Sequence, residues 1–117
     1  GGLEGAALGI ALFVAVGVQP FLEEVLFRCF LQPLLVQNFR ETGGIVLTSF
    51  VFALIHGWVA FLPVFCLSLL LGALYLRTRS IAAVAVIHGL HNGLVLALYL
   101  GSEGWRELSG ASGLLGS

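Results

Sequence analysis

Two adjacent carboxylates and an arginine stand inside a segment that is otherwise apolar. They are Glu23, Glu24 and Arg28, within residues 21–28. A charge at bilayer depth costs about 2.5 to 3.5 kcal/mol even on a lenient insertion scale, so these groups need partners or a function. At helical spacing Glu24 and Arg28 are i,i+4 neighbours and can neutralise each other, while Glu23 points about 100° away around the helix. Glu23 is therefore the expected free acid or base.

The composition around this segment is that of a membrane protein. Hydrophobic residues make up 59% of the chain and charged residues 9%, with a mean hydropathy of +1.08, whereas about 25% of residues are charged in soluble domains. The lipid bilayer is therefore an expected partner. The chain has no Lys and a net charge of -1, so it offers no basic surface and nucleic acid is excluded as a partner.

The hydrophobic runs predict an all-α fold, a polytopic transmembrane helix bundle with about four spans. The first run, residues 5–35, exceeds the roughly 20 residues of a perpendicular span, so we expect it to be interrupted near Pro20, with a weak point at Pro33. Residues 37–44 form the first polar turn. Further helices are expected at about 45–59, 61–76 and 81–100.

These helices suggest a division into a transmembrane core, residues 1–100, and a Gly/Ser-rich C-terminal tail, residues 101–117, expected to be frayed or interfacial. Because the chain opens without Met and directly in apolar sequence, we expect it to be part of a longer polytopic protein. Arg40, Arg77 and Arg79 fall on one side of a four-span topology. The positive-inside rule predicts that this side is cytoplasmic.

Few strongly polar side chains remain within the spans. They are Glu23, Glu24, Arg28, His56, His88, His91 and Asn92, with Gln19 and Gln32 at the edges of the spans. His88 and Asn92 are four residues apart and share one helix face, with His91 on its flank. Small residues recur beside them every fourth position, at 85, 89, 93 and 97, which favours close helix packing and turns the polar face inward. We interpret these groups as a common polar site.

Three stretches resemble, in order, the three motifs of the CPBP family of intramembrane proteases. Residues 23–28 resemble its EExxxR motif, residues 52–56 its FxxxH motif and residues 88–92 its HxxxN motif. The family includes the eukaryotic CAAX prenyl endopeptidase of type II and bacterial proteins linked to bacteriocin processing and self-immunity. The resemblance covers about residues 18–100. Each motif alone is a weak signal, but three in register on successive hydrophobic spans are a strong one.

The resemblance implies an endopeptidase that hydrolyses a peptide bond at or within the membrane. Its substrate would be a membrane-associated peptide or protein, such as a CAAX-type prenylated protein or a bacteriocin or leader peptide. The family pattern implies that Glu23 and His56 activate a water, while His88 and Asn92 stabilise the oxyanion. We expect the protein in a bacterial plasma membrane.

The remaining motif residues have expected structural roles. Glu24 and Arg28 would hold the first helix in register, and Phe52 belongs to the second motif. Metal use is left open, because one carboxylate and two imidazoles can hold a divalent ion such as Zn²⁺ or can activate water without one. The tentative ligands are Glu23, His56 and His88. We expect no obligatory structural metal.

Other protease chemistries fit the sequence less well. The chain has no Asp, which excludes an aspartyl protease, and it lacks the His-Glu-x-x-His spacing of zinc proteases. A rhomboid-like Gly-x-Ser-Gly at residues 110–113 follows every His-bearing helix, and we interpret it as chance. Cys29 and Cys66 are expected to be free thiols, and Cys66 has no cation nearby that would activate it.

A different class of function uses the same groups. Intramembrane carboxylates and histidines can relay protons or ions, and a family member can also act by binding, as an immunity or scaffold protein. A relay should tolerate exchange among titratable groups. Hydrolysis should require Glu23 itself.

Overall fold

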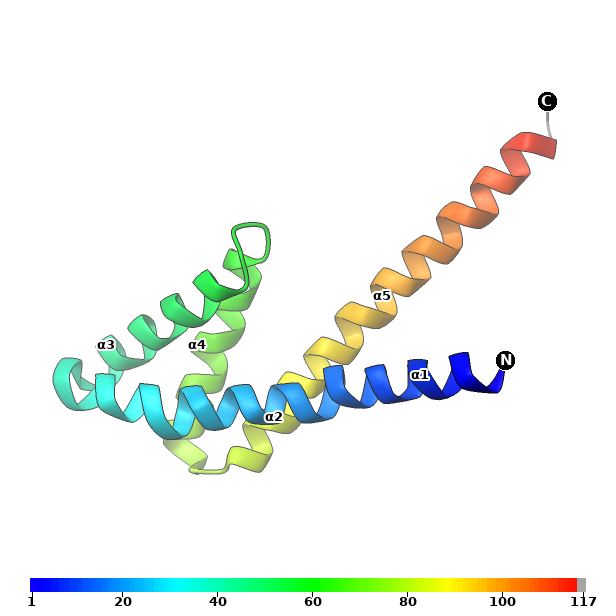
Figure 1. Ribbon diagram of the computed structural model, residues 1–117. Coiled ribbons are helices and arrows are strands. Elements are labelled where there is room, and N and C mark those ends of the chain that lie inside the picture. The colour runs from blue at the N-terminus through cyan, green and yellow to red at the C-terminus, as the bar shows by residue number, and fades with distance from the viewer. Residues whose placement is uncertain (116–117) are drawn as a thin grey trace.

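The computed structural model describes residues 1–115, with side chains placed through residue 110, and those residues contain helices and no strand (Figure 1). The expected all-α fold is therefore confirmed. In chain order the elements are α1 (Gly2–Phe13), η1 (Val14–Val18), α2 (Gln19–Glu24), η2 (Val25–Leu31), α3 (Gln32–Ile55), α4 (Phe61–Thr78) and α5 (Ile81–Leu115), where η marks a π-helical turn.

The first long helical run extends from α1 through η1, α2 and η2 into the first part of α3, and it stays helical through both prolines. Pro20 lies in the first turn of α2 directly after η1, and Pro33 lies in the first turn of α3 directly after η2. A proline inside an α-helix lacks an N–H, and its ring clashes with the carbonyl four residues back. The wider π-helical turn, with bonds between residues i and i+5, accommodates both defects. The expected interruption near Pro20 thus takes the form of a π-helical turn.

The chain reverses direction inside α3. Phe39 (φ −127°, ψ 15°) and Arg40 (φ 62°, ψ 179°) are not helical, and they lie within the polar turn expected at residues 37–44. Three helical runs are long and apolar enough to cross a membrane, over residues 2–55, 61–78 and 81–110. Because the first of them contains this reversal, four helical segments follow one another, close to the expected four spans.

Two helix ends differ from the sequence-based prediction. The second segment ends at Ile55 rather than near Val59, because Gly57 adopts φ 89° and turns the chain out of the helix. The last helix was expected to end at Leu100 but continues to Leu115. No proline interrupts residues 101–110.

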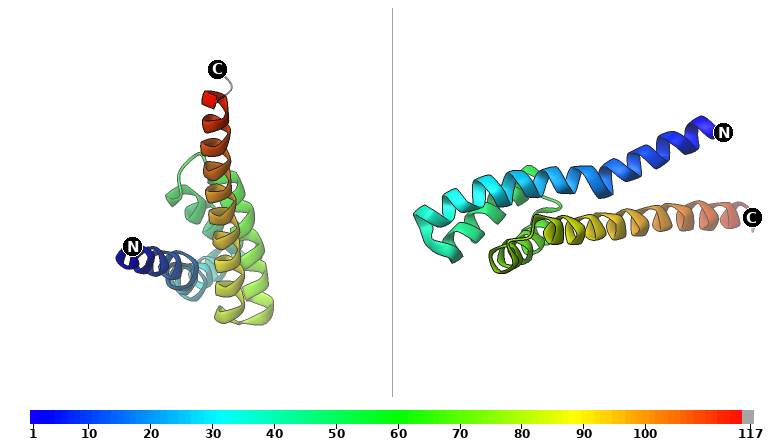
Figure 2. Two further views of the ribbon diagram at one scale, coloured as in Figure 1. Left: turned by 90° about the vertical axis from the view of Figure 1, so that its right-hand side faces the viewer. Right: turned by 90° about the horizontal axis from the view of Figure 1, so that it is seen from below.

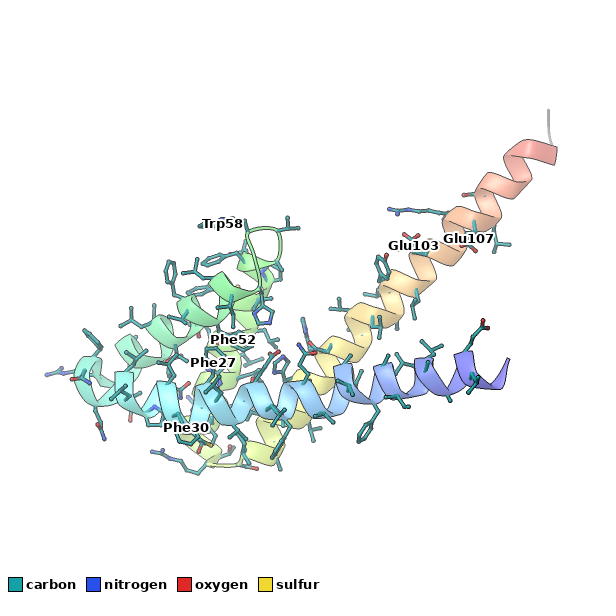
Figure 3. All side chains as sticks on the ribbon, viewed as in Figure 1. Phe27, Phe30, Phe52, Trp58, Glu103 and Glu107 are labelled. Carbon is teal, nitrogen blue, oxygen red and sulfur yellow. The ribbon has the colours of Figure 1, made fainter. Side chains whose placement is uncertain are left out.

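The extension of α5 is held by contacts at helical spacing. Arg106 donates to Glu103, three residues earlier, at 2.8 Å, and Figure 3 shows Glu103 and Glu107 projecting from this free end of α5. With 35 residues the helix is about 50 Å long, well beyond a hydrocarbon core of about 30 Å. Residues 116–117 of the expected tail lie outside the described residues.

The helices converge at one end of the molecule and diverge at the other. Figure 2 shows α1 and the distal half of α5 separating, with the two termini at the same end. No residue of α1 is buried. The buried apolar side chains lie where η2, α3, α4 and α5 meet. They are Phe27, Phe52, Ala53, Leu71 and Val84. The polar residues of the three motifs share this converging region.

Candidate active site

The carboxylate of Glu23 lies between two imidazole rings from other helices. Its Oε2 atom is 3.7 Å from Nε2 of His56, at the end of α3, and 3.6 Å from Nε2 of His88, on α5. Its Oε1 atom accepts a hydrogen bond from Gln19 at 3.0 Å, whereas Oε2 is buried without a hydrogen-bond partner. The structure therefore brings together three groups that lie far apart in the sequence.

The second ring nitrogen of each histidine is already engaged. Nδ1 of His56 is 2.7 Å from the carbonyl oxygen of Phe52, and Nδ1 of His88 is 2.8 Å from Oε1 of Glu24. Both partners accept hydrogen bonds, which assigns a proton to each Nδ1. In the neutral rings each Nε2 then carries a lone pair facing Glu23. The gaps of 3.6 and 3.7 Å exceed a direct hydrogen bond, and a water can bridge such gaps.

Access to this cluster is one-sided. The side chains of His56 and Glu23 are 29% and 20% exposed, while that of His88 is 3% exposed. The exposed part of the cluster therefore belongs to His56 and Glu23, while Oε2 of Glu23 is itself buried. The inner side, beyond His88, is closed by packed polar groups.

Glu24 joins the cluster to a buried ion pair. Its Oε2 atom accepts from Nε of Arg28 at 2.8 Å while Oε1 accepts from His88, and both Glu24 and Arg28 are fully buried. The expected pair between Glu24 and Arg28 is present. Sequence reasoning did not foresee the contact to His88, because it depends on how α5 crosses α2.

The guanidinium of Arg28 extends this network to α4. Nη1 donates to Oε1 of Gln32 at 3.0 Å, and Nη2 donates to the hydroxyl and the carbonyl of Ser68 at 2.8 and 3.1 Å. Gln32 in turn donates to the carbonyl of Gly72 at 3.2 Å. The sequence signal for these partners was spacing, because Arg28 and Gln32, like Ser68 and Gly72, are four residues apart and share a helix face.

Phe52 packs between the two imidazoles and the Arg28 guanidinium, whose central carbon lies 5.9 Å from the centroid of the Phe52 ring. It is fully buried, and its ring centroid lies 4.6 Å from that of His56 and 5.7 Å from that of His88. Its other close aromatic neighbour is Phe27, edge-on at 4.8 Å, and both are labelled in the converging region in Figure 3. The ring thus packs against both His56 and His88 and limits their movement.

The two polar residues of α5 that follow His88 within the matched motif region, His91 and Asn92, differ from it in their surroundings. Asn92 donates from Nδ2 to the carbonyl oxygen of Ala15 in η1 at 3.2 Å. Nδ1 of His91 is buried without a hydrogen-bond partner. Asn92 thus lies one turn beyond His88, and one of its two amide N–H groups is hydrogen-bonded to η1.

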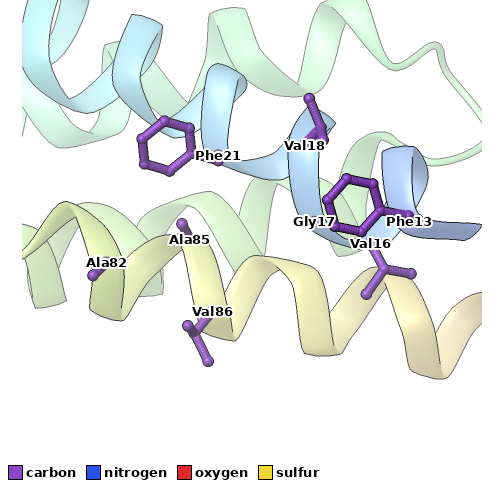
Figure 4. Close-up of a pocket in the computed structure, with 8 residues that line it drawn as sticks. All are labelled: Phe13, Val16, Gly17, Val18, Phe21, Ala82, Ala85 and Val86. Carbon is purple, nitrogen blue, oxygen red and sulfur yellow. The ribbon is translucent and has the colours of Figure 1, made fainter.

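An apolar groove is lined by residues outside the polar cluster. It has a volume of about 510 Å³, opens between η1, α2 and α5, and is lined by Phe13, Val16, Gly17, Val18, Phe21, Ala82, Ala85 and Val86 (Figure 4). None of these side chains can transfer a proton. The groove therefore offers an apolar surface, while the chemistry belongs to the carboxylate and the histidines.

The tentative metal site is supported by the type of its donor atoms but not by their present spacing. Carboxylate oxygen and imidazole Nε2 are zinc ligands, and ligand histidines commonly have the other nitrogen hydrogen-bonded, as His56 and His88 do. Within the described residues, however, no three His, Cys, Asp or Glu side chains are grouped so that they could hold a metal ion. Cys29 and Cys66 are free, as expected.

Comparison with known protein families places most of the chain within one family model. The family model described as type II CAAX prenyl endopeptidase Rce1-like matches residues 5–94. Searches of curated proteins and of solved structures returned no match. The matched range contains all three sequence motifs and every residue of the polar cluster.

Proposed function

The chain belongs to the type II CAAX prenyl endopeptidase Rce1-like family, and on this premise we propose that it is an intramembrane endopeptidase that uses Glu23 and His56 to activate a water. The family and the long apolar helices together fit an integral membrane protein. The family supports the coarse assignment as a protease, and the family together with the apolar helices supports the position in the membrane. The substrate and the roles of single residues are proposals.

One observation carries the proposal. Oε2 of Glu23 has no hydrogen-bond partner of its own and faces two imidazole nitrogens at 3.6 and 3.7 Å. Three neighbouring acceptor atoms with no hydrogen donor between them favour a molecule that supplies hydrogens, and water is the smallest such molecule. A water held there by its hydrogens presents its oxygen lone pairs outward, toward the open side of the site.

The proposed reaction begins when the water oxygen attacks the carbonyl carbon of the scissile peptide bond. Its proton passes to Glu23, and the carbonyl oxygen becomes an oxyanion. The C–N bond then breaks, and the proton moves to the leaving nitrogen as the new amine departs. The new carboxyl group and the amine account for all atoms of the water.

His88 and Asn92 are the proposed donors to the oxyanion. The free N–H of the Asn92 amide can donate directly. His88 can donate from Nε2 only when that atom carries a proton. The proton taken from water can reach it from Glu23 if the 3.6 Å gap shortens to a hydrogen bond, and His88 then passes the same proton to the leaving nitrogen when the C–N bond breaks. The carboxylate of Glu24 on Nδ1 stabilises the intervening imidazolium, as a carboxylate does in a Ser-His-Asp triad.

A divalent metal is not needed for this sequence of steps. When bound, such an ion would polarise the carbonyl or lower the pKa of the water, and Glu23, His56 and His88 would be its ligands. Because the present spacing does not suit a metal, no step is assigned to one. If cleavage survives extensive dialysis against a chelator, the metal-free proposal stands; a loss that Zn²⁺ restores overturns it.

The proposed substrate is a membrane-associated peptide, either the C-terminus of a CAAX-type prenylated protein or a bacteriocin or leader peptide. An apolar groove outside the polar cluster suits a substrate that arrives from the lipid phase. The protein would act in a bacterial plasma membrane. Bilayer lipid and the peptide are its proposed partners.

The direct test is cleavage by the purified protein in detergent. A fluorogenic farnesylated CAAX peptide, the same peptide without its lipid and a leader peptide are offered in parallel. We expect Glu23→Gln to reduce turnover about 100-fold to 10,000-fold, the usual contribution of a general base. His91→Ala, on the same helix as His88 but outside the cluster, is the matched control and should retain activity. Equal rates for Glu23→Gln and the wild-type protein would overturn the proposal.

A proton relay is the second candidate, because Glu24, His88, Glu23 and His56 form a chain of titratable groups. The buried end of this series of groups, at Glu24, does not favour a proton relay. Beyond Glu24 the network continues through Arg28 and Gln32 to a backbone carbonyl, and neither an amide nor a carbonyl releases protons. A relay would also work with Glu23→Asp or Glu23→His, which hydrolysis should not tolerate.

A further inference from the structure

The π-helical turn η1 leaves one backbone carbonyl without its helical donors. In an α-helix the carbonyl of Ala15 would accept from the N–H of Gln19, four residues later. In η1 the Gln19 N–H instead bonds to the carbonyl of Val14, five residues back. The residue at i+5 from Ala15 is Pro20, which has no N–H. Neither donor is therefore available to the Ala15 oxygen.

The donor comes from another helix. Nδ2 of Asn92 on α5 lies 3.2 Å from the Ala15 oxygen. Because a carbonyl only accepts, this contact assigns the amide nitrogen to the side facing η1 and fixes the plane of the amide. Its second N–H is left for another acceptor.

The close approach of α5 to η1 depends on Gly89. A Cβ atom at this position would collide with the carbonyl oxygen of Val16, which has also lost its α-helical donor at Pro20. Asn92 lies three residues after Gly89 on the same side of α5. The glycine thus brings the Asn92 amide within hydrogen-bond distance of the π-helical turn.

We propose that Pro20 is a positioning residue for the oxyanion site. By removing one backbone N–H it keeps the Ala15 carbonyl free to accept from Asn92, and this bond orients the second amide N–H of Asn92. The inference rests on the proposed function in assigning that second N–H to the oxyanion. The coupling between Pro20 and Asn92 rests on the geometry of η1 alone.

The second π-helical turn supplies a matched control. In η2 the Gln32 N–H bonds to the carbonyl of Phe27, and the next residue is Pro33, so the carbonyl of Arg28 has lost the same two donors. Among the residues that the structure describes, no side chain donates to this oxygen. The same backbone arrangement is present without a polar side chain that it could orient.

The first experiment compares Pro20→Ala with Pro33→Ala in the peptidase assay. Pro20→Ala restores an N–H that can bond to Ala15 or Val16, so Asn92 loses its exclusive acceptor. We expect kcat to fall by up to about 100-fold, as for other small misplacements of a catalytic group, with KM changed less than about twofold. Pro33→Ala should keep kcat near the wild-type value. Equal kcat for Pro20→Ala and the wild-type protein would overturn the inference.

A double variant tests whether Pro20 acts through Asn92. If it does, adding Pro20→Ala to Asn92→Leu costs no further activity, because the group being oriented is already gone. If the two losses multiply, Pro20 acts by another route and the inference is wrong. Loss of activity in Glu23→Gln, measured alongside, shows whether the proposed function holds, so the two failures are distinguishable.

A stability measurement tests the coupling even if no peptide is cleaved. Asn92→Leu should shift the ratio of folded to unfolded protein about threefold, the average for a hydrogen bond between membrane helices. In the Pro20→Ala background the same substitution should shift it much less, because the Ala15 carbonyl then has a backbone donor. An equal shift in both backgrounds would overturn the inference.

Discussion

All three nitrogens of the Arg28 guanidinium donate to buried groups, to Glu24, Gln32 and Ser68. Arg28→Ala would leave the Glu24 charge in a buried place with only His88 beside it. We expect a loss of about 3 to 5 kcal/mol in the free energy of unfolding, as is usual when one partner of a buried pair is removed. The measurement is folded yield in detergent together with reversible unfolding.

The control for this prediction removes both charges. Glu24→Gln combined with Arg28→Met leaves no unpaired charge, and its folded yield should exceed that of Arg28→Ala. If Arg28→Ala proves fully stable but inactive, the arginine binds substrate and its structural role is wrong.

Asn92 allows a test of the oxyanion role at a single amide. Asn92→Leu keeps the approximate volume and removes both N–H groups, and the loss of an oxyanion donor typically lowers turnover about 100-fold to 1,000-fold. Asn92→Asp should also be poor, because an ionised carboxylate would repel the oxyanion. Single-turnover cleavage by the purified variants checks both. Near-wild-type rates for Asn92→Leu would leave Asn92 with only its contact to Ala15.

The residues that sequence reasoning could identify are those that are costly in lipid. Glu23, His56 and His88 stood out because an ionisable group in an apolar span needs a reason, and the structure groups them. Their catalytic roles stay predictions. Ser68 and Gln32 were harder to place, because hydroxyl and amide groups cost less in lipid and their partners depend on how the helices cross.

At the scale of elements, the two π-helical turns are the features least accessible to sequence reasoning. A proline within an apolar run indicates that the helix must change, but it does not say whether the chain breaks, kinks or widens. In η1 and η2 it widens, which inserts one residue and turns the following helix by about 100° relative to a regular α-helix. Because η1 directly precedes α2, which carries Glu23 and Glu24, this rotation helps to set the direction in which both side chains face α5.

The end of α3 yields an element-scale prediction. Gly57 has φ 89°, and a Cβ atom at this position would meet no heavy atom within 4 Å, so a side chain there meets strain but no clash. We expect Gly57→Ala to lower the free energy of unfolding by about 1 to 2 kcal/mol, the cost of a left-handed conformation. Gly57→Asn should cost less, since Asn visits this region more readily. Thermal unfolding of both variants measures the difference.

Gly101→Ala is the matched control for that prediction. Gly101 lies inside α5 and also has open space around a Cβ, so alanine should leave stability unchanged or raise it by up to about 1 kcal/mol. If Gly57→Ala is as well tolerated as Gly101→Ala, the conformation at Gly57 is not what ends α3. The orientation of His56, the preceding residue, would then depend on Phe52 alone.

At the scale of the whole molecule, the arrangement of loops places the site relative to the two faces of the membrane. The loop of residues 56–60 lies at one end of the helix pair α3 and α4, and the reversal at Arg40 and the loop after Thr78 lie at the other (Figure 1). His56 belongs to the first of these ends. The open side of the carboxylate cluster is therefore remote from the arginine-bearing turns.

The final prediction concerns which face of the membrane the arginine-bearing turns occupy. The positive-inside rule predicts that they are cytoplasmic, which would place the loop of residues 56–60 on the outer face.

Single cysteines can report on the two faces in a background with Cys29→Ala and Cys66→Ala. Suitable exposed positions are Thr42, Thr78 and Val59. An impermeant maleimide added to intact cells should label Val59→Cys, and label Thr42→Cys and Thr78→Cys only after permeabilisation. The reverse labelling would contradict the predicted orientation. It would also turn the His56 side of the site toward the cytoplasm, whereas the predicted orientation turns it toward the outer face of the membrane.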